Sequence, residues 1–343
     1  MSKKIKMGLL TGFVLCFFGI FLFFLCYMAG GKSYVETADL DRLDGTATWE
    51  DRKPDLILEK TKLEDIASLE VELNDIHFFI EPSEDENYYI SYQVKSRKKQ
   101  TPIQYKIENK VLTIKENKKS FSFISIGIDI GGFFTGNLKK EKEEDYQEKV
   151  IIYVPKQEKL KDCQVTLHDS DIRIKEFCCE NVKIELAYGN LFLENASFLE
   201  SSMTLGDGKM EIENTDLHDT DIIVSYGDLK TKNCIIENGN ILLKDGTMDS
   251  SNVKFLKQNT IKSQYGDIKL GIEKEILNTM NLKLKTNYGK IEVPKDLSGS
   301  KESNEDNDTQ SYEKTIENTE NELQIIAEDG DIILAVEKHD RSV

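Results

Sequence analysis

Four tyrosines at repeated positions are the residues of this sequence with the clearest chemical potential. Each directly precedes a glycine, and their flat rings would allow stacking on a sugar. The interpretation we favour is structural, with each ring packed beside its own turn, because Asp207 and Asp245 occupy the same position in other repeats. The four residues are Tyr188, Tyr226, Tyr265 and Tyr288.

The position after the turn glycine raises the question of a calcium site. A calcium ladder needs a regular supply of oxygen ligands, and lysines interrupt this column, so we predict no metal-ligating residue. The column reads Asp171, Asn190, Lys209, Asp228, Thr247, Asp267 and Lys290. The histidines fall in different registers with no His-x-x-x-His pair; they are His77, His168, His218 and His339.

The sequence contains no recognisable set of catalytic residues. A polysaccharide-cleaving fold would combine carboxylates with basic residues and aromatic platforms. The repeated region has a single arginine, Arg173, and no tryptophan. Neither a Gly-x-Ser-x-Gly motif nor a phosphate-binding loop is present. We therefore predict a protein that is not an enzyme, with no catalytic or cofactor-binding residue and no cofactor.

These positions belong to a repeat that organises the chain. Counting from Ser170, the turn glycine recurs every 19 residues, and the next two intervals are 20 and 23. Apolar residues two apart within each unit indicate strands with one buried face. Because one unit cannot bury its apolar face alone, this period predicts stacked coils. The glycines are Gly189, Gly208, Gly227, Gly246, Gly266 and Gly289.

Two further columns support the stacking. Phe198, Leu217 and Ile236 recur at one apolar position and are expected to lie directly above one another. Asparagine tolerates left-handed backbone, and its amide can bond to the coils on either side. We therefore predict a structural asparagine ladder at a corner of the coils, made of Asn195, Asn214, Asn233 and Asn252.

The fold prediction is an all-β, single-stranded β-solenoid (β-helix-like) of roughly 19-residue coils, preceded by one N-terminal transmembrane helix. A polar stalk, helical in part from Leu56 to Ile66, precedes the first coil, and three strands follow it at 88–96, 102–108 and 110–115. The predicted segments are 1–31 (cytoplasmic N-terminus and transmembrane anchor), 32–66 (juxtamembrane stalk), 67–155 (first coil and meander or loop excursion), 156–294 (regular solenoid), 295–322 (flexible acidic insertion) and 323–343 (last coil and tail).

The N-terminal segment predicts a membrane anchor. An uncharged apolar run covers residues 8–31, enough to cross a bilayer, and Lys3, Lys4 and Lys6 precede it. This arrangement places the N-terminus in the cytoplasm and the remaining chain outside the cell. A cleaved signal peptide is the alternative, and the length of the apolar run favours an uncleaved anchor.

Charge limits the partners. The net charge is -17, from 62 acidic and 45 basic residues, which disfavours nucleic acid and favours cationic partners. The six cysteines form no metal or redox motif, and whether Cys163 and Cys178 pair is left open. The apolar stretch 121–135 is interpreted either as a cap on the end of the stack or as a partner or membrane contact.

The Tyr-Gly-Asp-Ile-type repeats, as in residues 265–268, and the segment Ile152-Tyr153-Val154-Pro155 resemble the bacterial "putative adhesin" β-strand-repeat family, a domain of unknown function. The resemblance covers about residues 69–336 and implies a β-solenoid displayed outside the cell, with no catalytic residues. The expected function is an adhesin-like or cell-envelope binding or scaffold protein, with an unknown protein, peptide or envelope-glycan partner. The alternatives are an envelope-stress sensor that binds cationic peptides and, ranked below it, a glycan-active enzyme.

Overall fold

The computed structural model describes residues 54–96, 101–117, 147–304 and 308–337. The chain divides into two units, residues 1–53 and 54–343, and the first lies outside the described residues. The predicted anchor, 1–31, therefore stays a prediction. The only helix in the described residues, α3 (Lys274–Thr279), has 6 residues, and no described helix has the length and apolar character to cross a bilayer.

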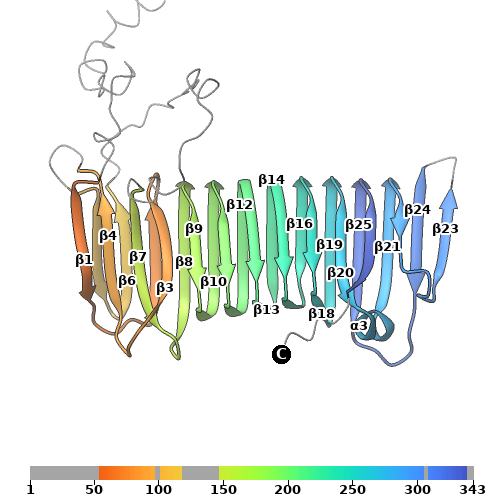
Figure 1. Cartoon of the computed structure of the whole chain (residues 1–343), viewed down its shortest axis with the longest axis horizontal. Helices are drawn as coiled ribbons and strands as arrows, with labels where there is room; N and C mark the ends of the chain where they lie inside the picture. Colours follow the sequence, from red (N-terminus) through yellow and green to blue (C-terminus); the bar gives the residue numbers. More distant parts are fainter. Residues whose placement is uncertain (1–53, 97–100, 118–146, 305–307, 338–343) are drawn as a thin grey trace, which may run out of the picture. The chain divides into compact units, whose positions relative to one another are not determined.

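The described part of the second unit is all-β, as predicted, and its strands stand side by side (Figure 1). The coils supply two long rows of strands. The first row is, in spatial order, β5 (Ile103–Glu108), β6 (Val111–Glu116), β2 (Ser68–Leu73), β8 (Lys159–Asp169), β10 (Cys178–Tyr188), parts of β12 (Ser197–Glu213) and β14 (Thr220–Lys232), β16 (Asn240–Asp245), β19 (Gln258–Tyr265), β25 (Glu322–Asp329), β21 (Asn281–Tyr288), β24 (Thr309–Lys314) and β23 (Ser300–Asn304).

The second row continues each coil after its glycine turn. Its order is β1 (Leu56–Lys62), β4 (Tyr89–Val94), β7 (Lys149–Pro155), β3 (His77–Ser83), β9 (Ile172–Lys175), β11 (Leu191–Glu194), the remaining parts of β12 and β14, β17 (Met248–Ser251), β20 (Ile268–Glu273), β26 (Ile332–Glu337) and β22 (Ile291–Glu292). A short third row contains the starts of β8, β10 and β12, then β13 (Asp216–His218), β15 (Ile235–Glu237) and β18 (Lys254–Leu256).

The 19-residue spacing is a stacking distance in space. Leu217 is the direct strand partner of both Phe198 and Ile236, as the apolar columns predict. All three side chains are fully buried in one continuous core. Burying a side chain of this size contributes about 1.5–3 kcal/mol, so the core accumulates stability coil by coil.

The order of the coils in space differs from their order in the sequence. The C-terminal coil, β25 and β26, lies between the coil of β19 and β20 and the coil of β21 and β22, as Figure 1 shows for the darker β25. Ile325 is accordingly the partner of both Ile261 and Leu284. The prediction that residues 323–336 form the last coil is therefore wrong in space, although the segment does form a coil.

The same arrangement occurs at the other end. Strand β2 lies between β6 and β8, and β3 lies between β7 and β9. The first coil of the sequence is thus also enclosed by later segments. Antiparallel strands finish both rows at one end (β1, β4 and β5), and at the other end β24 and β23 finish the first row, whereas the second row ends at β22. Where they occur, such strands keep the parallel coils from presenting an open sheet edge.

Two segments predicted to be outside the fold belong to it. Residues 56–62 form strand β1 and not a helix, because β1 pairs with β4 and Leu63 and Ile66 enter the core. Within the predicted flexible insertion, β23 and β24 form a hairpin that pairs with β21. The hairpin is anchored by Tyr312, which is 3% exposed.

The excursion after the first coil contains the three predicted strands, β4, β5 and β6. Strands β5 and β6 form the expected hairpin, with Asn109 and Lys110 in left-handed conformation at its turn. Strand β4 does not join them in a meander, because it pairs with β1 and β7 instead. The apolar stretch 121–135 lies outside the described residues.

The cysteines in the described residues are free thiols, so Cys163 and Cys178 do not pair. Cys163, Cys179 and Cys234 are buried in the core. Burial raises the pKa of the Cys179 thiol to about 12. A thiol with such a pKa is not a nucleophile at neutral pH, and we regard these residues as small apolar side chains.

Candidate functional site: an exposed tyrosine–aspartate edge

Glycine occupies the centre of the turn between the first and second rows in the coils that follow Ser170. Gly227 has φ +130°, and a Cβ added there would lie 1.8 Å from the backbone oxygen of Gly208 in the next coil. Side chains are rarely compatible with this φ, and the approach of the backbones leaves no space for one. The residue before each glycine is consequently held at an outer corner of the stack.

The residues before these glycines, together with Asp169 before the equivalent Ser170, form one column, which we call the tyrosine–aspartate edge. In space, tyrosine and aspartate alternate along these eight residues. The order is Asp169, Tyr188, Asp207, Tyr226, Asp245, Tyr265, Asp329 and Tyr288. In the sequence, Tyr265 and Tyr288 follow each other, and only the enclosed position of the C-terminal coil puts Asp329 between them.

The side chains of the edge are open to solvent. The tyrosines are 52–64% exposed, and the four aspartates are exposed as well. The expectation that each ring packs down beside its own turn is therefore wrong. Among the described residues, no ion pair or side-chain hydrogen bond engages Asp207, Asp245 or Asp329. The edge is thus a row of aromatic faces and carboxylates that the fold itself leaves unused.

The column after the glycine has a structural role instead. The side-chain oxygens of Asp171, Asn190, Asp228, Asp267 and Asp331 each accept a hydrogen bond from a backbone amide of a neighbouring coil. Asn190 N donates to Asp171 Oδ1 over 2.8 Å, and Asp331 N donates to Asp267 Oδ1 over 3.0 Å. Asp331 Oδ1 then accepts from Lys290 N over 2.8 Å. These oxygens are occupied by the backbone, and the described residues contain no group of three or more side chains suited to a metal ion.

The asparagine ladder is confirmed. Asn195, Asn214, Asn233 and Asn252 all have positive φ, between 51° and 54°. Asn233 donates from Nδ2 to Asn214 Oδ1 over 3.0 Å and accepts from Asn252 Nδ2 over 2.9 Å. The side-chain bonds of the ladder join Asn214, Asn233 and Asn252, and Asn195 shares their backbone conformation, so this corner of the coils is stabilised by asparagine as predicted.

The histidines that the structure describes do not converge. His77 accepts a hydrogen bond at Nδ1 from the Asp171 amide, and burial lowers its pKa. His218 lies 3.6 Å from Glu237 on the third row. His168 is the one near the edge, with its ring centroid 5.6 Å from that of Tyr188. His339 lies outside the described residues.

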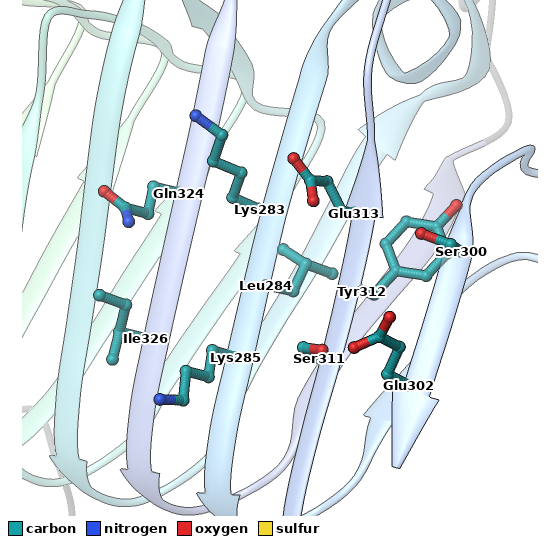
Figure 2. Close-up of a pocket in the computed structure, with 10 residues that line it drawn as sticks. All are labelled: Lys283, Leu284, Lys285, Ser300, Glu302, Ser311, Tyr312, Glu313, Gln324 and Ile326. Carbon is teal, nitrogen blue, oxygen red and sulfur yellow. The ribbon is translucent and has the colours of Figure 1, made fainter.

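A shallow groove lies where the hairpin of β23 and β24 meets β21 and β25 (Figure 2). Its volume is about 240 Å³, and its lining residues are Lys283, Leu284, Lys285, Ser300, Glu302, Ser311, Tyr312, Glu313, Gln324 and Ile326. Lys283 pairs with Glu322 at 3.0 Å, and Tyr312 donates to the Ser298 carbonyl. The carboxylates of Glu302 and Glu313 are both exposed, whereas burial usually raises the pKa of a general acid. The groove is therefore a weaker candidate than the edge.

Contacts between lysine and tyrosine occur elsewhere in the chain, and the sequence pattern gave no sign of them. The Nζ atom of Lys60 lies 4.8 Å from the ring centroid of Tyr89 and 4.3 Å from that of Tyr153. Arg173 is placed in the same manner, with its guanidinium carbon 5.1 Å from the Phe79 centroid and 5.9 Å from the Phe192 centroid. Cations within reach of two aromatic rings thus occur at two places on this surface.

Comparisons with known proteins give a family and a few similar structures. The family model described as Toastrack DUF4097 matches residues 66–335. A solved "putative cell adhesion protein" from Clostridium sporogenes is 13% identical, with 83% of this chain and 100% of that chain covered and a TM-score of 0.26. A "putative adhesin" from Bacteroides fragilis is 10% identical, with 82% and 98% covered and a TM-score of 0.32. No curated protein matches the sequence.

Proposed function

The chain belongs to the Toastrack DUF4097 family, and from this premise we propose that it is a membrane-anchored, extracellular β-solenoid protein that binds a component of the cell envelope without enzymatic activity. It would act as an adhesin-like or scaffold protein. The observation that carries the proposal is the tyrosine–aspartate edge, because a long row of exposed rings and carboxylates is a surface for binding.

The location outside the cell rests on the sequence. Lysines 3, 4 and 6 precede the apolar run 8–31, and this order favours a cytoplasmic N-terminus with the coils on the opposite side. A C-terminal epitope tag on the full chain tests the orientation. We expect protease added to intact cells to remove the tag, and a tag that is cleaved only after lysis would overturn this part of the proposal.

Binding is tested with the purified, fluorescently labelled full chain in detergent micelles that leave cells intact. We expect saturable binding to the surface of cells of the encoding organism. The double variant Tyr226→Thr and Tyr265→Thr should weaken it, because it removes two rings and keeps strand propensity. The matched control is Tyr105→Thr, which changes an exposed tyrosine of β5. Equal binding by the wild type and the double variant would contradict a role for the edge.

The exposed carboxylates of the edge favour one alternative, an envelope-stress sensor that binds cationic peptides. Such a sensor would bind through the same surface and differ in its consequence for the cell. Deleting the gene should then change the transcriptional response to cationic peptides, whereas a scaffold or adhesin should leave that response unchanged and alter attachment or envelope integrity.

A further inference from the structure

We propose that the tyrosine–aspartate edge binds an extended basic peptide, with one lysine or arginine side chain seated between each two successive tyrosines. The inference rests on the proposed binding function and names the chemistry of the partner. The structure offers three equivalent seats, centred on Asp207, Asp245 and Asp329, each with a tyrosine in the coil on either side.

The dimensions of a seat follow from the stack. Neighbouring strands are about 4.8 Å apart, so successive tyrosines, two coils apart, are separated by about 9.6 Å. A cation midway between them is about 4.8 Å from each ring, inside the range of about 6 Å over which cation–π attraction acts. The aspartate of the intervening coil supplies the opposite charge at the same height, so rings and carboxylate converge on one position.

The protein already contains a cation between two rings that lie two strands apart. Arg173 is the direct strand partner of both Phe79 and Phe192, and its guanidinium carbon lies 5.1 Å and 5.9 Å from their ring centroids. Both distances are within the range assumed for a seat. Along the edge, the strand between the two rings supplies an aspartate, so the cation would come from the ligand.

The spacing also selects the conformation of the ligand. A polyproline II segment has three residues per turn and rises about 3.1 Å per residue, so every third side chain lies on the same face, about 9.3 Å apart. This repeat is close to that of the tyrosines. A β-strand matches less well, because its third side chain points to the opposite face. A peptide with a basic residue at every third position would therefore occupy all three seats at once.

Charge favours a peptide of this kind over a neutral glycan. The chain has a net charge of -17, which attracts a basic ligand at long range. Along the edge, Asp207, Asp245 and Asp329 have no ion-pair partner among the described residues, so the ligand would not have to displace one. A neutral sugar would use the rings and gain no charge neutralisation from the carboxylates.

Two peptides of equal composition and charge test the proposal with the full-length chain in detergent micelles. One contains Lys-Pro-Pro repeated three times, and the other has its three lysines together followed by six prolines. Fluorescence anisotropy should show the spaced peptide binding about tenfold more tightly than the clustered one, and weakening as salt rises. Equal affinity of the two peptides would overturn the proposal.

Variants locate the binding. Tyr226→Thr with Tyr265→Thr should reduce the affinity for the spaced peptide about tenfold, and Asp245→Asn, which keeps the shape of the side chain, several-fold. Tyr105→Thr and Asp249→Asn are the matched controls, since both residues are exposed and lie away from the edge. Losses of equal size in the controls and in the edge variants would contradict the assignment.

A neutral chitin oligosaccharide is the competing ligand. The contrary outcome is that the chain binds this oligosaccharide and neither peptide, with weaker oligosaccharide binding in the tyrosine variants and unchanged binding in Asp245→Asn. That result would identify the ligand of the edge as a glycan and overturn the peptide proposal. If the labelled chain still bound intact cells, and the edge variants bound them less, the proposed function would remain supported. Absence of both peptide and cell binding would remove the proposed function as well.

Discussion

Asn233 joins three coils through one side chain and one unusual backbone conformation. Its φ is 53°, and its amide bonds to Asn214 and Asn252. Asn233→Gly, which keeps the left-handed conformation and loses both bonds, should lower the free energy of unfolding by about 1 kcal/mol. Asn233→Ala should lower it by about 1 kcal/mol more, because alanine is strained at this φ.

Denaturant unfolding monitored by circular dichroism measures both variants. The relative stability of the two variants is the informative result, because alanine normally stabilises regular structure more than glycine does. If Asn233→Ala were as stable as Asn233→Gly, the left-handed corner would not matter and the ladder would act through hydrogen bonds alone.

Asp228 shows how the column beside the edge responds to pH. Thr247 of the next coil donates to Asp228 Oδ1 from its hydroxyl over 2.7 Å and from its amide over 3.0 Å. The hydroxyl bond, followed by the amide bond, lowers the pKa of Asp228. A lowered pKa in the folded state stabilises the fold above the pKa of the unfolded chain, and this stabilisation is lost as pH falls through the folded pKa.

We expect Thr247→Val to raise the pKa of Asp228 towards its ordinary value, because the larger of the two hydrogen-bond effects is removed. The loss of stability in acid should then begin at a higher pH than in the wild type. Thr247→Ser retains the hydroxyl and serves as the control. A carboxyl NMR titration follows Asp228 directly, and an unchanged pKa in Thr247→Val would rule out this cause.

At the scale of single elements, α3 depends on a residue far along the chain. Lys314 of β24 is 5% exposed and donates from Nζ to the carbonyls of Leu277 and Met280, at 2.7 Å and 2.9 Å. These groups belong to the C-terminal end of the helix, where carbonyls have no partner within the helix. The ammonium therefore fixes the helix to the hairpin.

Lys314→Met should destabilise the protein by about 3 kcal/mol, because it leaves two buried carbonyls without a donor. The exposed Lys285 is the matched site, and Lys285→Met should change the free energy of unfolding by no more than about 0.5 kcal/mol. Thermal unfolding measures both. Similar melting temperatures for the two variants would show that the carbonyls find another donor.

Composition explains why the hairpin of β23 and β24 was not predicted. Residues 295–322 are rich in polar residues and bury few apolar side chains, the pattern of a flexible insertion. Its strands form because β21 supplies a backbone partner and because Tyr312 enters the core opposite Leu284. The strand partner β21 and the core contact of Tyr312 together stabilise these strands. The composition of residues 295–322 gives no information about β21, so the hairpin could not be predicted from it.

For the whole molecule, the repeat made the period, the core columns and the asparagine ladder predictable. Phe198, Leu217 and Ile236 recur at one spacing, and only stacking brings them together. The order of the coils was not predictable, since a coil such as 322–337 can pair with any neighbour of the same pattern. The strict alternation of the tyrosine–aspartate edge was missed for this reason, because Asp329 joins it only through the order in space.

Removing the C-terminal coil should therefore damage the interior of the stack. Truncation after residue 318 deletes β25 and β26, which separate β19 from β21. We expect hydrogen exchange to lose protection in 281–292 and in the described hairpin strands, although none of these residues is deleted, because each coil depends on its neighbours.

The comparison is a variant in which Gly and Ser replace the hairpin residues 300–313, so that Lys314, which holds α3, is kept. Strand β21 then loses one neighbour and keeps β25, so residues 281–292 should stay largely protected. If both variants exchanged alike, the enclosed coil would contribute no more than a terminal one, and the outer coil would be held by other contacts.

The enclosed position of β25 and β26 has a mechanical consequence. A coil at the free end of a stack can be peeled away one hydrogen bond at a time when its terminus is pulled. Residues 334–337 pair with β20 alone, but from Ile333 inwards the coil has parallel partners on both sides. A load on the C-terminus must therefore break two ladders together before the rest of the coil is released. A protein that bears tension during attachment would benefit from such a fastening.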